Sequence, residues 1–184
     1  MVRRTGRRYH RPLRSRSPLG LVALLLLIAL LAWRLQQEQD RPPVPASLAE
    51  GAYQIERVID GDTLLLTNGA RIRLIGADTP ETVKRNCPIE PWGPEAAEFT
   101  KQFVSGGRVR LQLDREQRDI YDRFLAYVWV GNRMLNEELI RAGLARARTS
   151  FYYSTAMKTR FRRAEDEARG AGRAIWSDPE GTAR

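Results

Sequence analysis

The chain has 184 residues, enough for one domain with a modest appendage but not for two domains with separate cores. Its net charge is +9, yet residues 1–34 hold eight arginines and no acidic residue, which leaves 23 basic against 22 acidic residues downstream. The basic pI therefore describes the N-terminal tail and is no evidence that the folded domain binds phosphate.

Few reactive side chains are available to the domain. The only histidine, His10, lies in the N-terminal tail, which excludes a Ser-His triad, a Cys-His dyad and a His-ligated zinc site. The single cysteine, Cys87, cannot form an internal disulfide and is expected to be a thiol without a chemical role. Catalysis must then rely on carboxylates, arginines, tyrosines and a hard metal ion bound through oxygen.

Residues 19–33 form an apolar run that follows seven arginines and ends at Trp33, beside Arg34. The run predicts membrane insertion, although it is shorter than the ~20 residues that comfortably span a bilayer. We favour an uncleaved anchor, because no small-x-small cleavage site follows the run, and a cleaved signal peptide is the alternative. The arginine-rich side should stay cytoplasmic, which predicts a C-terminal domain outside the cytoplasm, either anchored or secreted.

Residues 35–50 are polar and contain prolines, as expected of a linker between membrane and domain. The domain itself is predicted to span residues 51–178 and to be followed by a short tail, residues 179–184.

Five strands are predicted within the domain. They cover residues 52–58, 63–66, 70–75, 108–113 and 124–130. The second and third are joined by Asn68-Gly69, a strong hairpin signal. Residues 108–113 alternate apolar and polar side chains, as a half-buried strand does, whereas residues 124–130 are almost wholly apolar, as in a central strand.

Three helices are predicted around these strands. Pro94 opens the first, Asn136 can cap the second, which Gly143 ends, and apolar residues recur at helical spacing from Met157 to Ala168 in the third. This order of elements predicts an α+β fold, a small five-stranded β-barrel of the OB type with three helices.

Carboxylates gather at two predicted strand ends. Residues 60–63 (DGDT) lie between the first two strands, and residues 78–81 (DTPE) follow the third. Oxygen ligands on two nearby loops suit a hard divalent ion, and Pro80 forces Thr79 towards an extended conformation that frees its carbonyl to face the same space as Asp78. Each motif alone is also an ordinary turn sequence.

Two arginines flank these motifs, Arg73 on the third strand and Arg123 just before the fifth. An arginine guanidinium can form two parallel hydrogen bonds with a phosphate and neutralise the charge that builds up on phosphorus. Counting residues does not distinguish this role from that of a surface arginine.

Taken together, five segments resemble the staphylococcal (micrococcal) nuclease family. In order along the chain they are residues 58–63, 73–81, 93–96, 119–127 and 136–145. The resemblance extends to Trp176. It departs from the family at Trp92 and Ile120, where the family has tyrosine and lysine, and at Thr149 and Phe151, which replace a tyrosine pair. Substrate affinity and base preference are therefore not implied by it.

The resemblance implies a metal site and a general base. Asp62 and Asp78 would bind calcium with the Thr79 carbonyl, and Glu81 would be the general base or position the attacking water. Asp60 is expected to support the site and not to bind the metal directly.

It also implies a phosphate clamp. Arg73 and Arg123 would hold the scissile phosphate and stabilise the phosphorane, with Tyr121 near the bound nucleotide. Tyr152 or Tyr153 could stack on a base or could serve packing alone.

These expectations describe a calcium-dependent endonuclease that hydrolyses DNA and RNA, leaves 3'-phosphate ends and works as a monomeric domain. The first alternative is a catalytically inactive module of the same fold that binds nucleic acid or protein. The second is a membrane-tethered structural protein, whose signature would be a large exposed apolar patch.

Overall fold

The computed structural model describes residues 18–39, 43–82 and 90–177. Contacts divide the chain into two compact units, residues 1–41 and 42–184. The first unit contains a helix, and the second contains all of the β-structure. Cys87 and the tail residues 179–184 lie outside the described residues.

Helix α1 (Pro18–Gln39) makes up the described part of the first unit. It is rich in leucine and alanine, which favour helix, and its large apolar side chains from Leu21 to Leu35 are more than half exposed. In the part of the chain that the structure describes, no helix is long and apolar enough to cross a membrane. The predicted anchor through residues 19–33 is therefore not supported: the helix continues past Arg34 with polar residues, and its apolar run is shorter than the ~20 residues that span a bilayer. The alternative reading, a cleaved signal peptide, stays a prediction.

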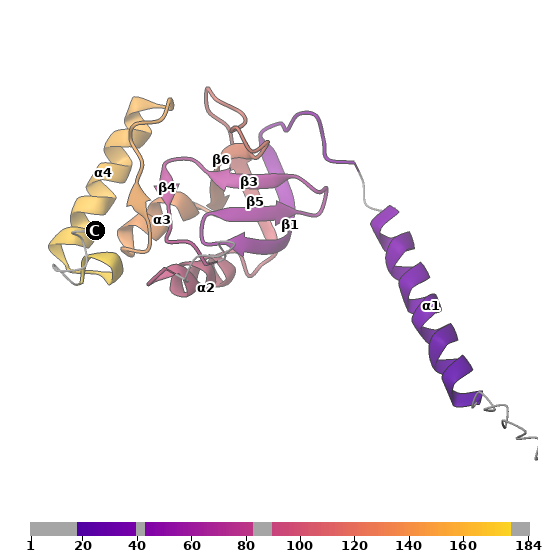
Figure 1. The fold of residues 1–184 in the computed structure, drawn as a ribbon. Helices are drawn as coiled ribbons and strands as arrows, with labels where there is room; N and C mark the ends of the chain where they lie inside the picture. The colour runs from indigo at the N-terminus through magenta and orange to yellow at the C-terminus, as the bar shows by residue number, and fades with distance from the viewer. Residues whose placement is uncertain (1–17, 40–42, 83–89, 178–184) are drawn as a thin grey trace, which may run out of the picture. The chain divides into compact units, whose positions relative to one another are not determined.

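Five strands of the second unit form a closed barrel (Figure 1). They are β1 (Gly51–Asp60), β2 (Thr63–Leu66), β3 (Arg71–Leu74), β5 (Arg108–Gln112) and β6 (Phe124–Val130). Neighbouring strands run antiparallel in the order β3-β2-β1-β5-β6, and a parallel pairing of β3 with β6 closes the barrel. The predicted α+β, OB-type barrel is confirmed, and each predicted strand agrees with an observed one to within a few residues.

Within residues 43–82 and 90–177, three very short strands accompany the barrel. Strand β7 (Arg133–Met134) pairs with the end of β6, and β4 (Ala77–Asp78) pairs with β8 (Arg146–Ala147) in a separate ribbon. None of them was predicted, because two residues are too few to establish an alternating pattern. The β4–β8 ribbon matters for the site, since it places Asp78 opposite Arg146.

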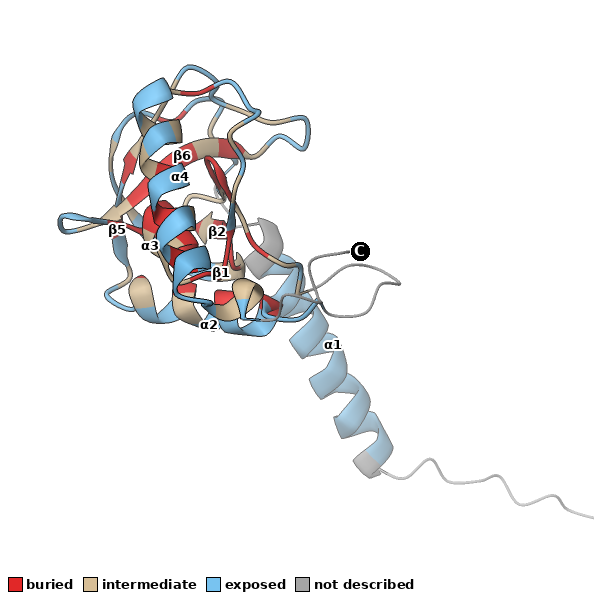
Figure 2. Cartoon of the chain, turned by 90° about the vertical axis from the view of Figure 1, so that its left-hand side faces the viewer, coloured by how far each residue is buried: buried red, intermediate tan, exposed pale blue. Residues whose placement is uncertain are grey.

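The three predicted helices are present as α2 (Gly93–Phe103), α3 (Leu135–Arg141) and α4 (Thr155–Gly170), and a 3-10 turn, Ala174–Trp176, follows. Figure 1 shows α3 and α4 side by side next to the barrel. Helix α4 buries Phe161, Ala164 and Ala168, and the Phe161 ring lies 6.1 Å from the rings of Tyr127 and Tyr153. Figure 2 shows buried residues on α3 and on the barrel strands, while the outer face of α4 is exposed.

Asn136 does not cap α3 as predicted. The helix begins one residue earlier, after Met134, and Asn136 is completely buried inside its first turn. Its side-chain oxygen accepts the Val128 N–H at 2.9 Å, and its amide donates to the carbonyls of Ile75 at 2.9 Å and Ala126 at 3.3 Å. A buried amide with three partners ties α3 to β6 and to the end of β3, which supports the seam where the barrel closes.

Candidate active site

The pairing that closes the barrel also assembles the site. Arg73 lies opposite Leu125 in the parallel β3–β6 pair and opposite Thr63 in the β2–β3 pair. Arg123 precedes β6 directly, and its Nη1 lies 3.4 Å from the Thr63 hydroxyl. The two predicted clamp arginines, far apart in the sequence, are thus brought to one cleft.

Arg73 lies between the two predicted metal-ligand carboxylates. Its Nη1 contacts a carboxylate oxygen of Asp62, and its Nη2 donates to Asp78 Oδ1 at 2.7 Å. Burial lowers the pKa of Arg73, and the charge of Arg123 lowers it further, while Asp78 and Glu81 oppose the shift. The guanidinium stays charged at neutral pH because an arginine titrates only far above it.

The loops that carry the two Asp motifs are pressed against each other. The Thr79 N–H donates to Asp62 Oδ2 at 3.0 Å, and the Thr63 hydroxyl donates to Asp62 Oδ1 at 3.0 Å. A side chain at Gly61 would place its Cβ only 2.8 Å from Thr79 Oγ1 and from Ala96 Cβ. The glycine between Asp60 and Asp62 is therefore required by close packing, and Asp62 is held in one orientation.

Asp60 also links the two loops that carry the Asp motifs. Its Oδ1 accepts the Thr82 hydroxyl at 2.7 Å and the Gly61 N–H at 2.8 Å. These contacts link Asp60 to Thr82, the residue after Glu81, and its predicted supporting role stays a prediction.

Glu81 is exposed, and its backbone is held from two sides. Its N–H donates to Glu90 Oε2 at 3.2 Å, and its carbonyl accepts the Glu90 N–H at 3.1 Å. A Cβ at Gly93 would lie 2.9 Å from that carbonyl oxygen, so the start of α2 packs directly on the Glu81 backbone. The charge of Glu81 acts on the pKa of Arg73, which places the two side chains within electrostatic reach.

Arg123 is oriented by Asp119. Its Nε donates to Asp119 Oδ2 at 2.7 Å, and its backbone N–H donates to Asp119 Oδ1 at 2.9 Å. Burial alone would raise the pKa of Asp119, but these hydrogen bonds outweigh it and hold the pKa below its ordinary value. The Arg123 guanidinium also lies 5.3 Å from the ring of Tyr121, whose side chain is largely exposed.

A cleft of about 330 Å³ runs between these groups and a set of aromatic side chains. Its polar wall carries Arg73, Asp78, Arg123 and Arg148, and Tyr121, Phe151, Tyr152 and Tyr153 also line it.

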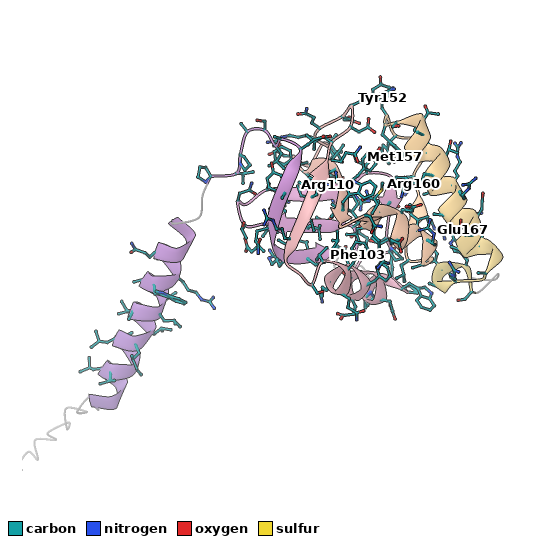
Figure 3. All side chains as sticks on the ribbon, turned by 180° about the vertical axis from the view of Figure 1, so that it is seen from behind. Phe103, Arg110, Tyr152, Met157, Arg160 and Glu167 are labelled. Carbon is teal, nitrogen blue, oxygen red and sulfur yellow. The ribbon has the colours of Figure 1, made fainter. Side chains whose placement is uncertain are left out.

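The structure separates the two tyrosines of the aromatic loop. Tyr153 is 3% exposed, burial raises its pKa to about 12, and its hydroxyl donates to the Arg148 carbonyl at 2.9 Å, so it packs in the core. Tyr152 is 66% exposed and points outward from the loop before α4 (Figure 3). Of the two, only Tyr152 is therefore available to a ligand.

The donor chemistry of the predicted metal site suits a hard cation. Among the described residues, no group of three or more His, Cys, Asp or Glu side chains gathers in a way that could hold a metal ion. The predicted donors are instead two carboxylates and one backbone carbonyl, and the structure brings Asp62 and Asp78 together at Arg73. Thr79 Oγ1 is a further buried oxygen without a hydrogen-bond partner in the described chain. An all-oxygen set with few protein ligands fits calcium, which accepts water and phosphate oxygens as well.

Two residues of the site escaped sequence reasoning. Asp119 lies within a family-like segment, but nothing in its spacing marks it as the partner of Arg123. Arg148 donates from Nε to Asp78 Oδ2 at 2.8 Å, and only the β4–β8 ribbon brings these two residues together. No motif or spacing in the sequence predicts either contact, that of Asp119 with Arg123 or that of Arg148 with Asp78.

Several known proteins similar to this chain are nucleases by name. The family of staphylococcal nuclease homologues matches residues 71–178. A thermonuclease of Staphylococcus hyicus is 40% identical over 166 residues, which cover 86% of this chain and 96% of the relative. A thermonuclease of Staphylococcus intermedius is 45% identical over 131 residues, covering 68% and 78%, and the endonuclease YncB of Bacillus subtilis strain 168 is 38% identical over 127 residues, covering 67% and 60%. On this evidence the chain belongs to the staphylococcal nuclease homologue family.

Proposed function

We propose that this chain is a nuclease that uses calcium to hydrolyse phosphodiester bonds of DNA and RNA and leaves 3'-phosphate ends. It is an enzyme of the hydrolase class, as the names of its relatives support. The observation that carries the proposal is the meeting of Arg73, Arg123 and the Asp62–Asp78 pair at the seam of the barrel, beside one cleft.

Arg73 and Arg123 are the phosphate-binding groups. Both line the cleft, and each has an aspartate that fixes its orientation, Asp78 and Asp119 respectively. Guanidinium groups held in place before the substrate arrives need no reorganisation when negative charge builds up on phosphorus. This arrangement supports binding and stabilisation of the phosphorane by the two arginines.

Asp62, Asp78 and the Thr79 carbonyl are the residues that would hold calcium. When bound, the ion would supply positive charge against the phosphate and the growing charge of the transition state. Two carboxylates make a weak site, in the ~10⁻⁴ to 10⁻³ M range of extracellular modules. Such a site suits a domain exported from the calcium-poor cytosol, and export through a cleaved signal peptide is the localisation we propose.

Glu81 takes a proton from the attacking water, or orients that water, as it forms a bond to phosphorus. The bond from phosphorus to the 5' oxygen breaks, the leaving oxygen takes up a proton, and the phosphate stays on the 3' side. Tyr121 lies beside Arg123 and contacts the adjoining nucleotide. Groups that read phosphate and not base edges make the site indifferent to the sugar, which supports action on both DNA and RNA.

The test is digestion of single-stranded DNA, duplex DNA and RNA by the full chain with and without calcium. Glu81→Gln is compared with Glu98→Gln, the same change on the exposed face of α2, where Glu98 contacts Lys101 and Gln102. We expect cleavage that needs calcium, is retained in Glu98→Gln and falls by 10²-fold or more in Glu81→Gln. Mass spectrometry of the products should find 3'-phosphates. A folded, calcium-supplied protein that binds but never cuts would instead support the inactive binding module.

A further inference from the structure

Arg148 is a third arginine in the cleft. Its Nε donates to Asp78 Oδ2 at 2.8 Å, while the other oxygen of Asp78 accepts from Arg73. The Arg148 side chain is 56% exposed, against 17% for Arg73. It is therefore the cleft arginine that solvent, and a ligand, reaches most easily.

The backbone of Arg148 is anchored although its side chain is exposed. Its N–H donates to the Gly76 carbonyl at 2.9 Å, and its own carbonyl accepts the hydroxyl of the buried Tyr153 at 2.9 Å. Gly76 has a φ of 71°, and a side chain there would clash with Tyr153 and Phe161. The backbone of Arg148 is thus fixed by the core, and its guanidinium pairs with Asp78.

Exposed aromatic side chains line the same cleft as Arg148. Phe151 and Tyr152 are 60% and 66% exposed, and the guanidinium of Arg115 lies 5.1 Å from the Tyr152 ring. Figure 3 shows Tyr152 at the edge of the domain, and its side chain also lines the cleft. Arginines alternating with exposed aromatic rings are typical of grooves that follow a single nucleic-acid strand.

We propose that Arg148 binds a second phosphate of the substrate strand, next to the phosphate held by Arg73 and Arg123. This inference rests on the proposed function. The ion pair with Asp78 is the form that Arg148 takes without substrate. A phosphate replaces the carboxylate as its partner, because phosphate oxygens accept charge-assisted hydrogen bonds from a guanidinium as carboxylate oxygens do. The preferred substrate is therefore a strand with consecutive phosphates, not a single phosphodiester.

Binding tests this without cleavage. In full-length Glu81→Gln protein, fluorescence anisotropy with a single-stranded oligonucleotide is measured over a range of salt concentrations, alone and with Arg148→Ala added. The control is Arg146→Ala, which removes the same charge from strand β8, just before Arg148, where the Arg146 guanidinium lies 4.6 Å from the Trp176 ring. We expect Arg148→Ala to reduce the slope of log Kd against log salt by about 0.7, the share of one neutralised phosphate on a single strand. Arg146→Ala should leave it unchanged, and Arg148→Lys should restore it.

Cleavage gives the second readout. With Glu81 in place, Arg148→Ala should lower kcat/KM for an oligonucleotide about tenfold and leave a dinucleoside monophosphate, which has one phosphate, unaffected. If Arg148→Ala lowered kcat/KM equally on both substrates, or had the same salt slope as Arg146→Ala, the proposed role of Arg148 would be overturned. The nuclease proposal would stand. Absence of any binding by the parent Glu81→Gln protein would overturn the nuclease proposal with it.

Discussion

At Gly93 two backbone segments approach too closely for a side chain between them. A Cβ there would lie 2.9 Å from the Glu81 carbonyl oxygen and 3.2 Å from that of Pro80. Because both neighbours are backbone atoms, the segment that carries Glu81 would have to shift. Gly93 thus supports the backbone of the proposed general base.

We predict that Gly93→Ala lowers kcat about tenfold or more, since displacements of ~1 Å at a catalytic group cost up to 10²-fold. KM should change little, because the cleft arginines lie on other elements. Gly106→Ala is the matched control, as a Cβ at Gly106 has no neighbour within 4 Å. Steady-state kinetics decide between the two outcomes: a Gly93→Ala enzyme with wild-type kcat would show that Glu81 does not depend on this contact.

Helices α3 and α4 are joined by Glu137, a nearly buried carboxylate with two arginine partners. Its Oε1 accepts from Arg141 Nη2 at 2.7 Å and its Oε2 from Arg160 Nε at 2.8 Å. Burial alone would raise the pKa of Glu137, but hydrogen bonds from Arg160 and Arg141 outweigh it and lower the pKa below its ordinary value. Figure 3 shows Arg160 on α4, together with Glu167, which contacts Arg141 at the exposed surface.

We predict that Glu137→Gln lowers the free energy of unfolding by about 1–3 kcal/mol at pH 7, less than for a fully buried pair because both arginines are partly exposed. A folded pKa below the unfolded one gives stability that is present above the unfolded value, near 4.3, and is lost as pH falls further. The difference from wild type should therefore shrink in acid. Urea unfolding at pH 7 and pH 3 measures it, and Glu167→Gln, at a partly exposed site, should cost less than 0.5 kcal/mol.

The sequence predicted the long elements of this fold because each carries a periodic pattern. In β5, Val109 and Leu111 are buried while Arg108 and Arg110 are exposed, as the alternation indicates. Two-residue strands have no period to detect, so the sequence does not predict the β4–β8 ribbon. For the same reason it does not predict the contact of Arg148 with Asp78. The cap predicted at Asn136 is wrong for a related reason. An asparagine near a helix start usually caps the helix, and only the tertiary structure reveals that this one belongs to a buried hydrogen-bond network.

The parts of the candidate site that consist of residues adjacent in the sequence could be predicted. The contacts between residues that only the fold brings together could not. The Asp60-Gly61-Asp62 motif could be located from the sequence, yet the reason for Gly61 is its packing on Thr79 and Ala96. Asp119 holds Arg123 through local hydrogen bonds, but no spacing rule distinguishes it from other turn aspartates.

For the whole domain, two buried tyrosines limit stability at high pH. Tyr127 donates to Asp114 Oδ2 at 2.6 Å, and burial and this hydrogen bond raise its pKa well above its ordinary value. Burial raises the pKa of Tyr153 to about 12. In the unfolded chain both would ionise near pH 10, so the unfolded state loses protons first and stability falls as pH rises above that value.

We predict that the free energy of unfolding is steady from pH 7 to 9 and falls steeply between pH 10 and 12. Urea unfolding across this range checks it, with Tyr153→Phe as the test variant, since phenylalanine cannot ionise. The fall should be shallower in Tyr153→Phe, whereas Tyr121→Phe, at a largely exposed tyrosine, should follow the wild type. If the free energy of unfolding fell equally steeply with pH in all three proteins, the proposed role of Tyr153 would be contradicted.

The parallel seam between β3 and β6 has a consequence for how activity appears during folding. Strands β1, β2 and β3 pair with one another as sequence neighbours, whereas the pairing of β1 with β5 and that of β3 with β6 join segments on either side of α2. Pairs distant in sequence form late, because the entropy of closing a long loop must be met first. Arg73 and Arg123 meet only when this seam closes, so a chain still being synthesised carries every proposed active-site residue and no working site. We therefore expect nuclease activity to appear only once this seam has closed.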